Sequence, residues 1–220
     1  MRLHQLWLVL LLICGQTVFA VDLNKENRDE KYVTSIVARS KKIVDKLNIS
    51  DPQRAQEVTN VIANRYFLLN DIYEKRDIAV KAVKESDADK EKKDAAIRIA
   101  DSERDAALYH AHFAFEGALS LYLDEKQVEE VKNGMTYNVV NVTYTAYLDM
   151  IPSLKEDEKI QIMAWLKEAR EYAMNGENSN KKHAVFGKFK GRINNYLAAR
   201  GYDLQAERKG WYERIEAAKK

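Results

Sequence analysis

The sequence contains few of the residues that cross-link or interrupt a chain. Its 220 residues include one cysteine, two prolines and eight glycines. The cysteine, Cys14, lies in an N-terminal segment that we expect to be removed, so the mature chain forms no disulfide and depends on its core for stability. About 200 residues suffice for a sizeable core in one domain. Scarce proline and glycine beside abundant Ala, Lys, Glu and Leu predict an all-α fold.

Long apolar runs are missing after the N-terminal segment. The run Leu6–Ile13 follows Arg2 and leads through small or apolar residues to Ala20, which is the pattern of a secretory signal peptide and is too short for a membrane span. We expect a signal peptide over 1–20, cleavage after Ala20, and a periplasmic or secreted protein without a transmembrane segment. Lipoprotein processing requires a small residue before the cysteine, and Ile13 stands there, so we expect that Cys14 is not lipidated.

Charge of neither sign dominates. The chain has 36 Lys and Arg against 34 Asp and Glu, and removing Arg2 with the signal peptide leaves a net charge of +1. This balance argues against a nucleic-acid partner. Residues 181–220, however, carry eleven basic and four acidic residues. That local excess indicates either a solvated face or a surface for anionic ligands such as uronic acids, sulfates or phosphates.

The sequence lacks the common motifs of metal and nucleophile sites. His110 and His112 are two residues apart, so on a helix they point in different directions and cannot chelate one ion. The acidic stretch Glu85–Asp94 has neither the glycine nor the final glutamate of a calcium loop. No HExxH, GxSxG or phosphate-binding glycine loop occurs. We therefore expect no metal and no cofactor, and the sequence favours a protein that is not an enzyme.

Helical spacing of apolar residues and capping signals divide the chain into elements. We expect N-caps at Asp51, before Pro52, and at Asp124 and Asp203, with glycines ending two helices. The stretch Thr136–Ile151 is rich in β-branched and aromatic residues and suits a strand or a buried helix; in a helical chain we favour a loop leading into a helix. The expected helices cover 27–47, 52–84, 95–122, 125–135 (closed near Gly134), a segment ending before Pro152, 154–175, 181–199 (closed by Gly201) and 204–218.

The two longest expected helices are joined by the charged segment Glu85–Asp94. Helices of about 30 residues span roughly 45 Å. We therefore predict a long antiparallel helical hairpin over about 52–122 and a C-terminal multi-helix body over about 123–220, within a single domain over 21–220. The hairpin either projects from the body or lies within a bundle.

The segment Lys181–Asp203 mixes ring faces, cations and amides more densely than any other part of the chain. Carbohydrate sites use ring faces for sugar C–H surfaces and use amides, acids and arginine for hydroxyl groups. We expect this segment to meet Thr136–Asp149 and the helix bearing Trp165 in a pocket. The alternative is that the rings form core and the cations are solvated. The predicted ligand-binding residues are Tyr137, Tyr144, Asp149, Trp165, His183, Lys188, Arg192, Asn195 and Tyr196, of which Lys188, Arg192 and Asn195 share a helix face that could grip a carboxylate.

The second half of the chain is similar to a known family. Lys132–Leu204, with its run KKHAVFGKFKGRINNYLAARGYDL, resembles the signature half of domain-of-unknown-function family 3826, and the similarity extends from about Tyr32. The resemblance implies a secreted protein typical of Bacteroidetes and other polysaccharide-degrading bacteria, without an established reaction and with a sugar-binding role. A looser similarity of Leu123–Gln127 to the periplasmic LTxxQ-motif helical proteins implies a chaperone or stress sensor.

Binding of a saccharide or a small polar or anionic ligand, in polysaccharide utilisation, is the function that these observations favour. Two alternatives remain. The hairpin could serve as a periplasmic chaperone or stress sensor, or the protein could be a glycan-active enzyme that uses Asp149, His183 or Lys188.

Overall fold

The computed structural model describes residues 21–219, and within that range it contains helices and loops but no strand, so the all-α prediction is confirmed. The expected signal peptide, 1–20, lies outside the described residues. No helix in the described part of the chain is long and apolar enough to span a membrane. The helices are α1 (Glu30–Val44), α2 (Pro52–Glu85), α3 (Lys90–Ser120), α4 (Glu125–Met135), α5 (Val139–Met150), α6 (Glu156–Met174), α7 (Ser179–Ala199) and α8 (Leu204–Ala217).

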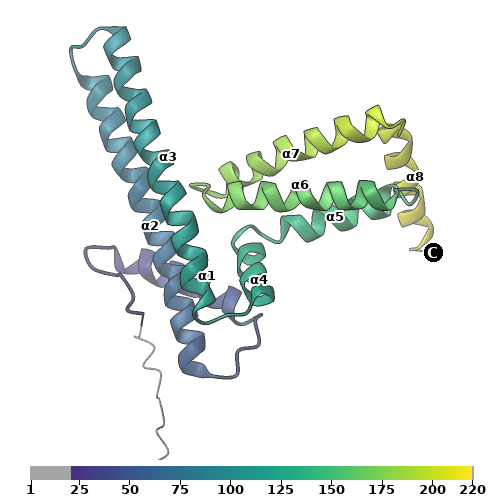
Figure 1. The fold of residues 1–220 in the computed structure, drawn as a ribbon, viewed down its shortest axis with the longest axis horizontal. Helices are drawn as coiled ribbons and strands as arrows, with labels where there is room; N and C mark the ends of the chain where they lie inside the picture. The colour runs from purple at the N-terminus through teal and green to yellow at the C-terminus, as the bar shows by residue number, and fades with distance from the viewer. Residues whose placement is uncertain (1–20, 220) are drawn as a thin grey trace, which may run out of the picture.

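The two longest helices, α2 and α3, lie side by side as a hairpin whose turn projects beyond the other helices (Figure 1). At the opposite end of this hairpin α1 packs on α2, and α4 contacts both α1 and α3. The chain then leaves the hairpin, and α5, α6 and α7 extend sideways from it, with α8 at their far end (Figure 1). The α6–α7 loop thereby returns to the side of the hairpin.

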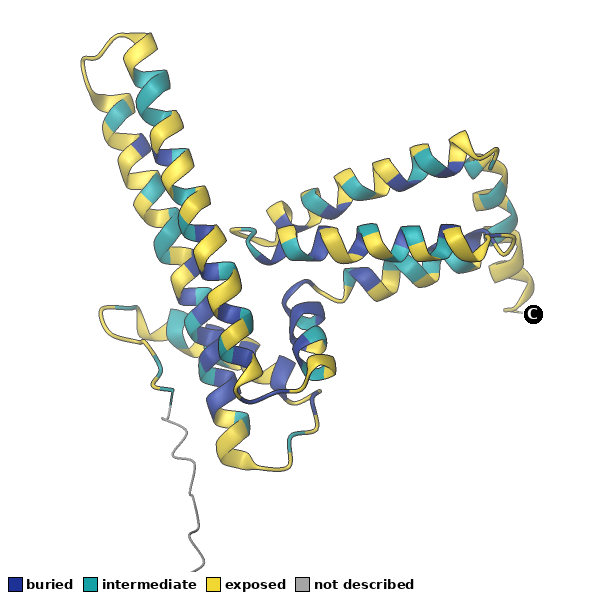
Figure 2. Cartoon of the chain, viewed as in Figure 1, coloured by how far each residue is buried: buried dark blue, intermediate teal, exposed yellow. Residues whose placement is uncertain are grey.

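Buried apolar residues form two main cores. The first joins α1, α2, α3 and α4 through residues such as Ile62, Leu119 and Met135. The second joins α5, α6 and α7 through residues such as Ile162 and Phe186, with α8 packed against it. Buried positions are concentrated where α1–α4 meet and become sparse towards the hairpin turn (Figure 2). The outer hairpin is therefore held mainly by contacts between its own two helices.

Most helix ends follow the expected capping chemistry. Asp51, Asp124 and Asp203 each accept hydrogen bonds from backbone N–H groups of the turn that follows. One start is wrong in the sequence prediction: α3 begins at Lys90 instead of Ala95, because Asp89 caps it by accepting from the Lys92 N–H. Charged residues such as Lys and Glu are good helix formers in water, so this turn needs no apolar partner.

The helix α4 has the expected bounds, but Gly134 lies inside it and is not the left-handed residue that was expected to close it. The left-handed residues are Tyr137 and Asn138, just after the helix, with φ angles of 58° and 57°. Gly134 has a different role, because a Cβ at this position would lie 2.8 Å from Cγ2 of Ile43. Its missing side chain lets α1 pack directly on the backbone of α4. Gly201, at φ 94°, ends α7 as predicted.

Gly134→Ala should destabilise the protein. The added methyl group overpacks the site against Ile43, at about 1–3 kcal/mol, while the higher helix propensity of alanine returns about 1 kcal/mol. Gly187→Ala is the matched control, because Gly187 lies within α7 with nothing within 4 Å of a Cβ, so this change should be neutral or stabilising. Urea unfolding of both variants tests this, and equal effects would contradict the packing assigned to Gly134.

Candidate functional site

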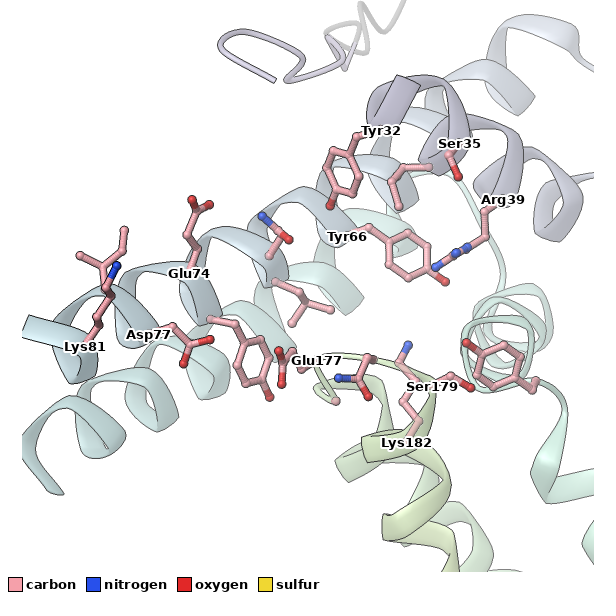
Figure 3. Close-up of a pocket in the computed structure, with 18 residues that line it drawn as sticks. Tyr32, Ser35, Arg39, Tyr66, Glu74, Asp77, Lys81, Glu177, Ser179 and Lys182 are labelled. Carbon is pink, nitrogen blue, oxygen red and sulfur yellow. The ribbon is translucent and has the colours of Figure 1, made fainter. Parts of the chain in front are cut away.

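A groove of about 670 Å³ separates α1 and α2 on one side from the α6–α7 loop and the start of α7 on the other. Figure 3 shows Tyr32 and Tyr66 on the first wall and Lys182 on the second. Tyr73 and Tyr137 also line the groove, so four tyrosine rings face one space. Because α1 and α2 are far in sequence from Tyr137 and from the start of α7, the groove exists only in the folded chain.

Polar groups of every kind surround these rings. The side chains offer hydroxyl and amide groups for hydrogen bonds, carboxylates that accept, and cations that donate. Tyr32 and Tyr66 have hydroxyl groups without a hydrogen-bond partner among residues 21–219, whereas the Tyr73 hydroxyl donates to the Asn175 carbonyl at 2.7 Å. The polar lining comprises Ser35, Asn70, Asn178 and Ser179, the acids Glu74, Asp77 and Glu177, and the cations Arg39, Lys81 and Lys182.

Lys182 is the most unusual of these groups. It is 5% exposed, its Nζ donates to the Met135 carbonyl at 3.0 Å, and the same Nζ lies 5.4 Å from the centroid of the Tyr66 ring. Burial, together with the charges of Arg39 and Arg65, lowers the pKa of Lys182 to about 8. Burial likewise raises the pKa of Tyr66 to about 12, so this phenol stays neutral.

Local sequence explains how Lys182 reaches this position. Asn178 caps α7 by accepting from the Lys181 N–H, which places Lys182 in the first turn of the helix. Gly176, in the loop before it, lies so close that a Cβ there would be 2.9 Å from Cγ of Lys182. The lysine stem therefore occupies the space that a larger residue at Gly176 would need.

A cluster of charged and polar contacts holds the α6–α7 loop against the hairpin. Arg65 of α2 donates to Oδ1 of Asn175 at 2.6 Å, at the residue that ends α6. One turn earlier, Glu171 contacts His112 of α3 at 3.4 Å and Lys132 of α4 at 3.2 Å. Burial raises the pKa of Glu171, but His112, Lys132 and Arg170 outweigh it and lower the pKa to about 2. Glu171 therefore stays ionised and joins α6 to α3 and α4.

The three segments expected to meet do lie together, but they do so mainly through apolar packing. Val140, Ile162 and Phe186 from α5, α6 and α7 share the second core. The Tyr147 hydroxyl also donates to Oδ1 of Asn194 at 2.7 Å. Tyr144 packs against this core, and Asp149 is exposed at the end of α5.

Most of the predicted site residues lie on the outer face of α6 and α7. Arg192 stacks over the Trp165 ring with Cζ 4.4 Å from its centroid, and its Nη1 lies 3.4 Å from Glu168. Trp165 in turn meets the Tyr196 ring edge-on at 5.0 Å. Lys188 and Asn195 are exposed on α7. This α6–α7 face is a second surface on which rings and a cation gather.

Of the predicted residues, Tyr137 lines the groove, and His183 stacks on its ring at 5.4 Å. The groove residues of α1 and α2 were not predicted. The available signal was helical spacing, since Tyr32 and Arg39, like Tyr66 and Tyr73, are seven residues apart and so lie on one face of their helix. The same spacing is expected of helix faces that pack in a core. It does not show that these faces of α1 and α2 lie opposite the start of α7.

Residues 21–219 contain no group of three or more His, Cys, Asp or Glu side chains placed to hold a metal ion. The groove itself offers ring faces, hydroxyl and amide groups, carboxylates and cations.

Lys182→Met should change how stability depends on pH. Between pH about 8 and its ordinary pKa of 10.5, the lysine of the unfolded chain still holds a proton that the folded protein has released, so rising pH stabilises the wild type. The stability of the variant relative to the wild type should therefore fall by up to roughly 3 kcal/mol over that range. Urea unfolding of both proteins from pH 7 to 10 measures this difference in the free energy of unfolding. If the pH profiles of variant and wild type run parallel, Lys182 keeps its ordinary pKa.

No curated protein matches the chain. One family model does, and it covers residues 33–217, a span that includes both walls of the groove apart from Tyr32. The chain belongs to the family described as Protein of unknown function (DUF3826).

Proposed function

We propose that the groove between α1, α2 and the α6–α7 loop binds a saccharide or another small polar ligand. The observation that carries this proposal is that four tyrosine rings face a space also lined by hydroxyl, amide, carboxylate and cationic groups. Ring faces pack against sugar C–H surfaces, and the polar groups can donate to and accept from sugar hydroxyls. The volume of about 670 Å³ lies within the range of small-ligand sites, about 300–1,000 Å³.

The proposal includes export and a role in polysaccharide utilisation. The N-terminal pattern from Arg2 through Leu6–Ile13 to Ala20 supports secretion or transport to the periplasm. The resemblance to secreted proteins of Bacteroidetes and other polysaccharide-degrading bacteria supports saccharides as the ligand class. The groove binds and orients such a ligand without a cofactor.

Tyr137→Ala should weaken saccharide binding about tenfold, because loss of one ring contact removes roughly 1–1.5 kcal/mol. Titration calorimetry with a panel of mono- and oligosaccharides measures it. Tyr172→Ala is the matched control, since Tyr172 is 60% exposed on α6 outside the groove and Tyr137 is 50% exposed. Binding lost in Trp165→Ala or Arg192→Ala but kept in Tyr137→Ala would move the site to the α6–α7 face.

A periplasmic chaperone is the second candidate, and exposed apolar residues on the hairpin favour it. Ile78 and Ile99 are 63% and 61% exposed, and Tyr109 and Phe113 are 63% and 58% exposed with their rings 4.9 Å apart. Exposed apolar surface can hold unfolded chains.

If this second function is present, the protein should suppress aggregation of a reduced, unfolding client, and Tyr109→Ser with Phe113→Ser should abolish the effect. Light scattering measures it. Suppression that survives this double change, or that is absent from the wild type, would remove the hairpin chaperone from consideration.

A further inference from the structure

We infer that the groove's ligand carries an anionic group, a carboxylate or a sulfate, which binds between Lys182 and Arg39. This inference rests on the proposed function, because it specifies the class of saccharide that the groove takes. It places the anion site at the first turn of α7 and not on the exposed Lys188–Arg192–Asn195 face.

The two cations converge on one ring. The Lys182 Nζ lies 5.4 Å and the Arg39 Cζ 5.6 Å from the Tyr66 ring centroid. They come from opposite walls, Arg39 from α1 and Lys182 from α7 (Figure 3). Among residues 21–219 neither side chain forms an ion pair with a carboxylate. An anionic group between the two walls could therefore contact both.

Two other buried cations of the chain, Lys132 and Arg170, do have carboxylate partners. Lys132 pairs with Glu116 at 2.9 Å and with Glu171 at 3.2 Å. Arg170 pairs with Glu129 at 3.3 Å and also contacts Glu171. Burying a charge is costly unless a partner compensates it. Lys182 has only the Met135 carbonyl, so the missing partner is one that the protein itself does not supply.

Two further features make this end of the groove positive. Arg65, next to Tyr66 in sequence, is 3% exposed, and its Nε and Nη1 have no hydrogen-bond partner in the described structure. Burial lowers the pKa of Arg65 to about 10, which still leaves it charged at neutral pH. The start of α7, at Asn178 and Ser179, also lines the groove, and the N-terminus of a helix favours anions.

The groove's carboxylates lie mainly towards its other end. Figure 3 shows Glu74 and Asp77 along α2, away from Arg39 and Lys182, with Glu177 between the two ends. Carboxylates accept hydrogen bonds from sugar hydroxyls and repel a second anion. The groove would therefore bind an acidic sugar in one direction, with its anionic group at Lys182 and its hydroxyl groups towards Glu74.

Because Lys182 releases its proton at about pH 8, the affinity for an anion should fall above that pH. Burial and the charges of Arg39 on α1 and Arg65 on α2 set the pKa of Lys182. The other titratable groups at this end of the groove are Tyr66, Tyr137, with the His183 ring stacked on it, and Glu177 before α7.

Calorimetry on the mature protein with matched ligand pairs tests the inference. The probes are glucuronate, galacturonate and digalacturonate, each compared with its neutral methyl ester, and glucose 6-sulfate compared with glucose. At pH 7 the charged member of at least one pair should bind at least tenfold more tightly, and its affinity should decline between pH 8 and 10. Preference for the sulfate pair or for a uronate pair identifies which anionic group the groove takes.

Lys182→Met should abolish the preference for the charged ligand, whereas Lys188→Met, the same change at an exposed cation of α7 outside the groove, should keep it. Equal affinities within every pair, or a preference that survives Lys182→Met, would overturn the inference while leaving saccharide binding in place. If no saccharide binds at all, the proposed function fails and the inference fails with it.

Discussion

The two halves of the structure are joined at the end of α6, where charged and polar contacts link this helix to α2, α3 and α4. The two main cores each close largely on themselves, except that Met174, the last residue of α6, is buried in the first core. Beside Met174, the contacts of Glu171 with Lys132 and of Asn175 with Arg65 set the place where the two parts meet. These contacts bring the α6–α7 loop to the side of the hairpin. The groove is the space left between that loop and α1, and its shape follows directly from this joint.

The same joint explains why charge is distributed so unequally between neighbouring sites. Ionised Glu171 compensates the charges of Lys132 and Arg170, whereas Arg65 in the same joint has only the side-chain oxygen of Asn175 as a partner. A few residues away, Lys182 is buried without a carboxylate. Buried charges without a carboxylate partner, such as those of Lys182 and Arg65, cost stability, so their presence in a fold held by its own core indicates that they have a use. Ligand binding is the use that we propose.

Local chemistry in the sequence predicts much of the fold. Aspartate caps, the turn at Gly201 and the helix after Thr136 follow from residues within a few positions of one another. Gly134 shows the limit of prediction from neighbouring residues, because its role depends on contact with Ile43, which is far away in the sequence. A glycine near a helix end reads as a stop signal until the helix that packs on it is known.

The site was harder to predict for the same reason. The segment Lys181–Asp203 contains Lys182, but its helical spacing favours a site on the outer face of the helix, where Lys188 and Arg192 lie near aromatic residues. Spacing defines the faces of a helix, and tertiary packing decides which face meets which. The sequence predicts Tyr137 as a site residue because it lies in a polar, aromatic segment. Tyr32 and Arg39 lie in a helix whose apolar spacing is that of an ordinary core helix, so nothing in the sequence marks them as groove residues.

Ligand binding between α1, α2 and the start of α7 is the proposal from which the other functional statements follow. A crystal structure of the mature protein with the saccharide that binds most tightly in calorimetry tests this most directly. We expect electron density for the sugar between Tyr66, Tyr137 and Lys182, with an anionic group within hydrogen-bonding distance of the Lys182 Nζ. Density along the outer face of α6 and α7, beside Trp165 and Arg192, would contradict it.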